Sequence, residues 1–115
     1  MKTLELLNKE EEDIIKASKY LDSVTEKRTL NKNIKELTFI RMVKNYLHTN
    51  PDEDAIRAEL KKLQDTKAGI EVRFNEWMES TPGAKRMKNP KTEFMKKTGI
   101  SKVEDSIKTL TYILS

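Results

Sequence analysis

One long apolar stripe with a clear start and a clear end dominates this sequence. The run Asn50-Pro51-Asp52-Glu53 offers a helix N-cap, a proline at the first helical position and a carboxylate three residues after the cap. Ser80-Thr81-Pro82-Gly83, a turn-forming run, follows the stripe. Between these runs, apolar residues recur at spacings close to three and four, at Ile56, Leu60, Leu63, Ile70, Phe74 and Trp77. We therefore predict one helix over about 51–79, roughly 44 Å long, against which the other elements pack.

The stripe is interrupted by Lys67 and then by Gly69, which divides it into two seams. The first seam is expected to pack on the two preceding helices. The second seam needs a different cover, which is either the C-terminal helix or another subunit. We therefore predict a self-association or partner seam at the end of the long helix, formed by Ile70, Phe74, Trp77 and Met78.

Two helices are predicted before the long one. The first starts after Asn8, which has a carboxylate three residues later, or earlier at Thr3, and its apolar spacing continues to Val24. The second follows Asn33, which is also followed by a glutamate three residues later, and spans 34–48. Because the break before Pro51 is so short, we predict a tight hairpin between this second helix and the long helix.

Two short helices are predicted after the long one. Asn89-Pro90 opens a helix that Gly99 closes, and Ser101 with Glu104 forms a capping box for the last helix. The predicted fold class is therefore all-α, a helical bundle built on the long central helix. With 115 residues the chain fits a single domain, in which 1–80 form a helical core and 81–115 form a basic connection and the C-terminal helices.

Composition argues against most enzyme classes. The chain has no cysteine, three glycines and one histidine, His48, so thiol nucleophiles, glycine-rich phosphate loops and the common zinc motifs are excluded. We expect no catalytic residue, no metal and no cofactor. Carboxylate pairs such as Glu76 and Glu79 could serve a hydrolase that uses two carboxylates. We rank this enzyme third among the functional hypotheses, after the two binding functions given below. The acidic run Glu10 to Asp13 is interpreted as a first helical turn that stabilises the helix dipole, rather than as a metal site.

Positive charge is concentrated towards the end of the sequence. Residues 1–80 contain 15 basic and 16 acidic side chains, whereas residues 81–115 contain eight basic and three acidic ones. Residues 85–102, a stretch of 18 positions, contain seven of these basic residues. The stretch could line a phosphate backbone or meet an acidic protein surface, and it could equally be a solvated basic loop. Only Phe94 is available there for stacking on bases. The basic residues are Lys85, Arg86, Lys88, Lys91, Lys96, Lys97 and Lys102.

These observations lead to two functional hypotheses. The first is a non-enzymatic interaction or assembly factor that binds itself or a partner protein through helix faces. The alternative is a nucleic-acid-binding accessory protein without sequence specificity, which would use residues 85–102. No run of 18 apolar residues and no signal-peptide pattern occurs, so we expect no membrane partner and a cytoplasmic protein, or an intravirion one if phage-encoded. The composition would suit a small phage or mobile-element protein.

Overall fold

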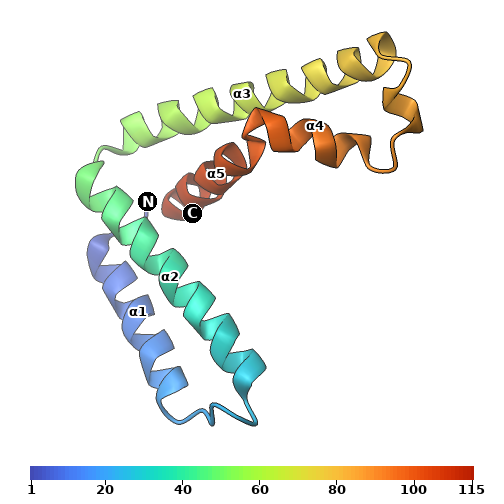
Figure 1. Cartoon of the computed structure of the whole chain (residues 1–115). Coiled ribbons are helices and arrows are strands. Elements are labelled where there is room, and N and C mark those ends of the chain that lie inside the picture. The colour runs from blue at the N-terminus through green and yellow to red at the C-terminus, as the bar shows by residue number, and fades with distance from the viewer. The chain divides into compact units, whose positions relative to one another are not determined.

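The computed structural model describes residues 1–115 and confirms the predicted all-α class. The chain has five α-helices, is 82% helical and contains no strand. Figure 1 shows these elements in chain order. They are α1 (Leu4–Lys19), α2 (Lys27–Thr49), α3 (Glu53–Ser80), a 3₁₀ turn η1 (Ala84–Arg86), α4 (Pro90–Thr98) and α5 (Ile100–Leu114). No helix combines the length and the apolar character needed to cross a bilayer.

The helices form two compact units. Unit 1 contains residues 1–56 and 112–115, and unit 2 contains residues 57–111. The units differ in charge, because unit 1 holds 10 basic and 11 acidic residues whereas unit 2 holds 13 basic and eight acidic residues. That the whole chain behaves as a single domain stays a prediction.

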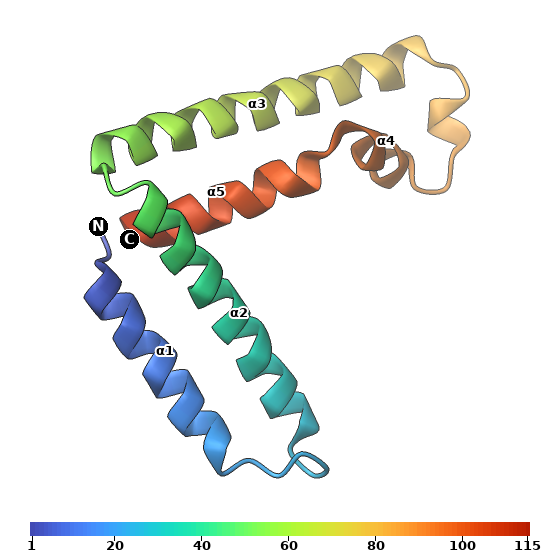
Figure 2. The same cartoon turned by 60° about the vertical axis from the view of Figure 1, so that its left-hand side comes forward.

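Unit 1 is organised around a hairpin of α1 and α2, which lie side by side in Figures 1 and 2. The predicted hairpin between helix 34–48 and the long helix stays a prediction, because most of α3 belongs to unit 2. Across the α1/α2 pair, Glu11 of α1 accepts ion pairs from Arg41 (3.5 Å) and Lys44 (3.4 Å) of α2. The buried apolar residues of the unit are Leu7, Ile40, Val43, Leu47, Ile56 and Ile113.

The first helix begins at the earlier of the two predicted starts. The hydroxyl of Thr3 accepts a hydrogen bond of 3.1 Å from the backbone N–H of Leu6, so Thr3 is the N-cap and a start after Asn8 is wrong. Burial of Leu7 and a 2.7 Å backbone hydrogen bond from Lys2 to the carbonyl of Ile113 stabilise this first turn. A helix start can thus be decided by a contact that is remote in sequence.

The same helix ends earlier than its apolar spacing indicated. It stops at Lys19, and Val24, predicted to continue the stripe, is 82% exposed. A carboxylate oxygen of Asp22 accepts backbone hydrogen bonds from Val24 (2.7 Å) and Thr25 (3.4 Å), which favours a turn over another helical turn. These hydrogen bonds to the charged form lower the pKa of Asp22 below its usual value.

The starts of α2 and α3 also differ from the predicted ones. Helix α2 begins at Lys27, and Asn33 is not its cap, because the Asn33 amide donates to the Ser18 hydroxyl of α1 at 3.1 Å. Helix α3 begins at Glu53, because Asn50 completes the end of α2 by donating to the carbonyl of Tyr46 at 3.1 Å. Asp52 then supplies the capping carboxylate, which accepts from the N–H of Asp54 at 3.0 Å.

Unit 2 follows the predicted order after Ser80. Helix α4 begins with Pro90 and ends at Gly99, whose φ of 70° is the left-handed conformation that a helix C-cap favours. Helix α5 begins at Ile100, one residue before the predicted capping box, so Ser101 is not its N-cap. Ile100 is buried, which holds this first residue in the helix. The other buried residues of unit 2 are Ile70, Ala84, Thr109 and Leu110.

Candidate binding surfaces

The seven basic residues singled out from the sequence lie on three successive elements of unit 2. They are carried by η1 (Lys85, Arg86), by the connection after it (Lys88), by α4 (Lys91, Lys96, Lys97) and by α5 (Lys102), and all are exposed. Lys96 makes a 3.9 Å ion pair with Glu93, whereas the other six have no carboxylate within salt-bridge distance. We call residues 85–102 the basic segment, and most of its charge is free to meet an anionic partner.

A hollow adjoins part of the basic segment where α4 turns into α5. Its volume is about 550 Å³, and two basic residues, Lys91 and Lys96, and one acidic residue, Glu104, are among the residues that line it. Glu104 also pairs with Lys67 of α3 at 3.7 Å. The hollow therefore has both charge signs, and it is not a purely cationic site for phosphate.

The predicted seam at the end of α3 is largely covered within unit 2. The ring of Phe94, from α4, lies 5.5 Å from the ring of Phe74 and 5.2 Å from that of Trp77, measured between centroids. Ile70 is buried, and Phe74, Trp77 and Met78 are half-buried. The short helix α4, which was not among the two predicted covers, supplies this ring contact. That the seam also meets another subunit or a partner protein stays a prediction. Phe94, considered for base stacking, instead completes an aromatic cluster with Phe74 and Trp77.

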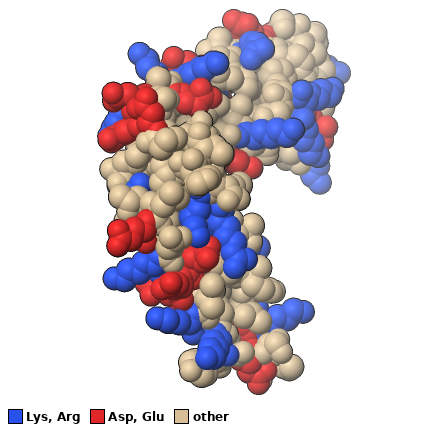
Figure 3. Space-filling view, turned by 90° about the vertical axis from the view of Figure 1, so that its left-hand side faces the viewer, with Lys and Arg blue, Asp and Glu red and all other residues tan.

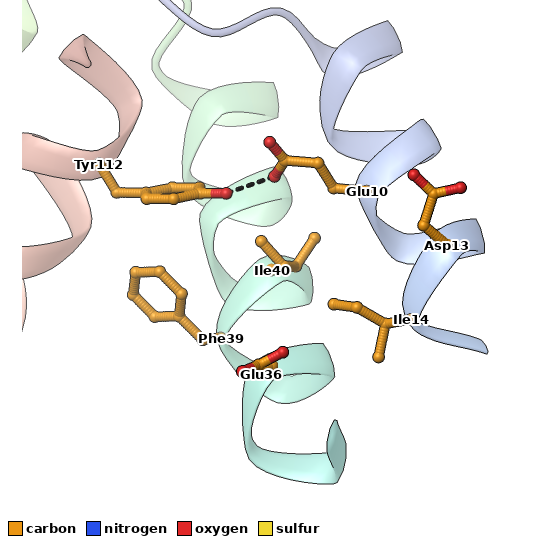
Figure 4. Close-up of a pocket in the computed structure, with 7 residues that line it drawn as sticks. All are labelled: Glu10, Asp13, Ile14, Glu36, Phe39, Ile40 and Tyr112. Atoms are coloured by element: carbon orange, nitrogen blue, oxygen red, sulfur yellow. Dashed lines mark hydrogen bonds between the residues drawn. The ribbon is translucent and has the colours of Figure 1, made fainter. Parts of the chain in front are cut away.

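Unit 1 contains a cleft that the sequence analysis did not predict. Its volume is about 360 Å³, and it lies between α1, α2 and the last turn of α5 (Figure 4). Carboxylates and an apolar floor line it together, which gives it both electrostatic and hydrophobic character. We call it the acidic cleft, and its lining residues are Glu10, Asp13, Ile14, Glu36, Phe39, Ile40 and Tyr112.

One side of the acidic cleft is closed by internal hydrogen bonds and charges. The hydroxyl of Tyr112 donates to a carboxylate oxygen of Glu10, as Figure 4 shows. The ammonium group of Lys2 lies 3.1 Å from the other oxygen of Glu10 and 4.4 Å from the centroid of the Tyr112 ring. Burial of the phenol, reinforced by the hydrogen bond to Glu10, raises the pKa of Tyr112 to about 12. The Glu10 carboxylate is thus already satisfied by the protein.

The other two carboxylates of the cleft have few partners. Asp13, on α1, is exposed and has no ion pair. Glu36, on α2, has only Lys32 at 4.0 Å, and both side chains of that pair are about half-exposed or more. Pairs of this kind contribute little to stability because water screens them. Two carboxylates therefore stand beside an apolar hollow with unused capacity for cations.

The position of the acidic run Glu10 to Asp13 corrects its interpretation. Because α1 begins at Leu4, these residues lie in the second and third turns, where the helix dipole has little effect. Glu10 bonds to Tyr112, Glu11 pairs with α2, and Asp13 lines the cleft. The first-turn interpretation is therefore wrong, and two of the four residues, Glu10 and Glu11, make contacts between helices.

A second groove lies on the α1/α2 hairpin towards its connecting loop. Its volume is about 290 Å³, and apolar side chains of both helices line it. Ile15 of α1 and Ile34 of α2 are exposed at 44% and 53%. We call it the hairpin groove, with lining residues Ile15, Ser18, Lys19, Asn33, Ile34 and Leu37. Figure 3 shows that basic and acidic side chains alternate over the lower part of the visible face, where the hairpin lies.

Comparisons with protein-family models, with curated proteins and with solved structures found no match.

Proposed function

We propose that this chain is a non-enzymatic assembly protein that binds another protein through the helical surface of unit 1. The observation that carries the proposal is the distribution of exposed apolar side chains. Eight of the ten large exposed hydrophobic residues belong to unit 1, which concentrates on one unit the side chains that favour protein association. The eight are Met1, Leu4, Leu6, Ile15, Tyr20, Val24, Ile34 and Met42.

The hairpin groove is the part of this surface best suited to a protein partner. Ile15 and Ile34 flank a concave apolar site, which a helix or an extended segment of a partner could fill with one or two aliphatic side chains. Tyr20, at the end of α1, is 85% exposed, and tyrosine combines a large apolar ring with a polar hydroxyl. The alternating charges of the hairpin match the polar rim that surrounds the apolar core of many interfaces.

A double substitution tests this proposal directly. We expect Ile15→Glu with Ile34→Glu to abolish binding of the partner that the wild-type chain retains in affinity capture, because two carboxylates would be desolvated in the interface. Val72→Glu in unit 2 is the matched control, since Val72 is an equally exposed apolar residue at 55%. Retention of the same proteins by both variants, with helicity unchanged, would contradict a role for the hairpin groove.

Nucleic-acid binding is the second candidate function, and a separate observation favours it. Six exposed cations without ion pairs lie in a unit that has five more basic than acidic residues. Such a surface attracts a phosphate backbone with little dependence on base sequence. A titration with single- and double-stranded nucleic acid at about 50 mM salt tests it, because ordinary non-specific binders reach about 10⁻⁴–10⁻⁶ M even at physiological salt. Absence of binding at low salt would remove this candidate.

A further inference from the structure

The basic segment contains one exposed apolar side chain among its cations. Met87 is 40% exposed and lies between Arg86 and Lys88, with Lys85 one position further back. No acidic residue occurs between Ala84 and Lys91. Phosphate groups attract the cations but offer no apolar surface, so binding to phosphates alone would not use the methionine side chain.

The acidic cleft of unit 1 has the complementary properties. Its floor of Ile14, Phe39 and Ile40 is apolar, and its volume of about 360 Å³ can accept an unbranched thioether side chain, which adapts readily to irregular space. Asp13 stands at the cleft on α1 and Glu36 on α2, both exposed and with unused capacity for cations. An apolar side chain flanked by cations would therefore satisfy the hollow and its carboxylates together.

We propose that the Met87 segment of one copy of this chain, residues 85–88, docks in the acidic cleft of a second copy. The side chain of Met87 enters the hollow, and the cations beside it face Asp13 and Glu36. The charge of the two units supports this pairing, since unit 1 has a net charge of −1 and unit 2 of +5. This inference uses a surface different from the hairpin groove, so it goes beyond the function proposed above.

Docking of this kind joins two different surfaces, so a pair of copies joined by one contact keeps one free cleft, on the first copy, and one free segment, on the second. Association is then heterologous, and it produces chains of copies, or closed rings where the rotation between copies permits closure. Because the contact is small and its charges are partly exposed, we expect association to be weak and to decrease with salt. Mass should therefore increase with concentration above that of a monomer, up to a reciprocal dimer or larger ring where the assembly closes, and further where it stays open.

Light scattering of the full chain and of two charge-reversed variants tests the proposal. We expect the wild-type mass to increase with protein concentration at low salt and to return to that of a monomer at high salt. Asp13→Lys with Glu36→Lys, and Lys85→Glu with Arg86→Glu, should each remain monomeric, because cleft and segment then repel one another. An equimolar mixture of the two variants should associate again, since the native segment of one meets the native cleft of the other.

Matched controls separate docking from a general effect of charge. Glu5→Lys with Glu12→Lys alters net charge as much as the cleft variant but lies outside the cleft, and Lys61→Glu with Lys62→Glu does the same for the segment variant. Both controls should associate like the wild type. Met87→Ala should weaken association several-fold without any change of charge. Circular dichroism establishes that each variant is folded, and the uncharged pair Asp13→Asn with Glu36→Gln replaces the cleft variant if it is not.

Three results would overturn the proposal. They are a wild-type mass that is monomeric at every concentration and salt, failure of the two folded variants to associate when mixed, and loss of association in the controls. Failure here is distinguishable from failure of the proposed function, because the cleft variant leaves Ile15 and Ile34 unchanged. Capture of a partner by the hairpin groove should therefore persist in the cleft variant.

Discussion

The hydroxyl of Tyr112 donates a hydrogen bond to the carboxylate of Glu10, a residue 102 positions earlier in the sequence. Lys2 completes the arrangement by pairing with Glu10 and lying over the Tyr112 ring. The last turn of α5 is thereby joined to the first helix within unit 1. The contact also forms one wall of the acidic cleft, so the same groups stabilise the unit and shape its candidate binding site.

The first prediction concerns this hydrogen bond. We expect Tyr112→Phe to lower the free energy of unfolding at neutral pH by about 1–2 kcal/mol, because a hydrogen bond to a charged acceptor is lost and the site is partly open to water. The edge contact of the ring with Phe39, at a centroid distance of 5.2 Å, should be retained. Urea unfolding of the variant and the wild type measures the difference. Tyr20→Phe, at an exposed tyrosine, should have almost no effect.

The second prediction is the pH dependence that follows from the same residue. The pKa of Tyr112 is about 12 in the folded protein against an ordinary value of 10.0, so folding favours the protonated phenol. Its contribution to stability is complete below about pH 10 and is lost as the pH rises towards 12. Wild-type stability should therefore fall more steeply over this interval than that of Tyr112→Phe. Parallel curves for the two proteins would contradict the hydrogen-bonded geometry.

The third prediction concerns the aromatic cluster. If Phe74 were fully buried, Phe74→Ala would lower the free energy of unfolding by about 3–5 kcal/mol. Because the ring is half-buried, we expect a decrease of about 2–3 kcal/mol. Lys67→Ala should be nearly neutral, because the 3.7 Å pair of Lys67 with Glu104 is exposed. Denaturant unfolding of both variants checks the contrast. A negligible loss at Phe74 would show that Phe94 does not cover the end of α3.

The fourth prediction compares two glycines. Gly99→Ala should destabilise the protein by about 1 kcal/mol, because a φ of 70° is unfavourable for a residue with a Cβ atom. Gly69→Ala should stabilise it by up to about 1 kcal/mol, since Gly69 lies inside α3 and an added methyl group meets no atom within 4 Å. Thermal unfolding measures both changes. Equal effects at the two positions would contradict the left-handed cap at Gly99.

The fifth prediction applies if the basic segment binds nucleic acid. The logarithm of affinity should then fall with the logarithm of salt concentration by about 0.7–0.9 per phosphate contact. Lys85→Glu with Arg86→Glu should reduce this slope by roughly two contacts' worth and leave the fold intact, because both side chains are exposed. Lys61→Glu with Lys62→Glu, exposed on α3, should leave the slope unchanged. A fluorescence titration at several salt concentrations measures it.

The sequence alone determined the features that depend on neighbouring residues. The all-α class follows from helical apolar spacing, and the start of α4 at Pro90 follows from the fixed φ of proline. The end of α4 at Gly99 follows from the freedom of glycine to adopt positive φ. The end of α3 at Ser80 likewise follows from the turn-forming run after it. In each case the physical cause lies within a few positions of its effect.

Only the tertiary structure decided which of several adequate local signals was used. Asn8, Asn33 and Asn50 all resemble helix caps, yet Asn33 bonds to Ser18 and Asn50 completes α2, so other residues begin the helices. The cover of Phe74 by Phe94 and the closure of the acidic cleft by Tyr112 join residues 20 and 102 positions apart, respectively. The spacing of apolar residues along the sequence indicates which of them share a helix face. The partner of that face is set by packing between helices, because burial and hydrogen bonding act on distance in space and not on distance along the chain.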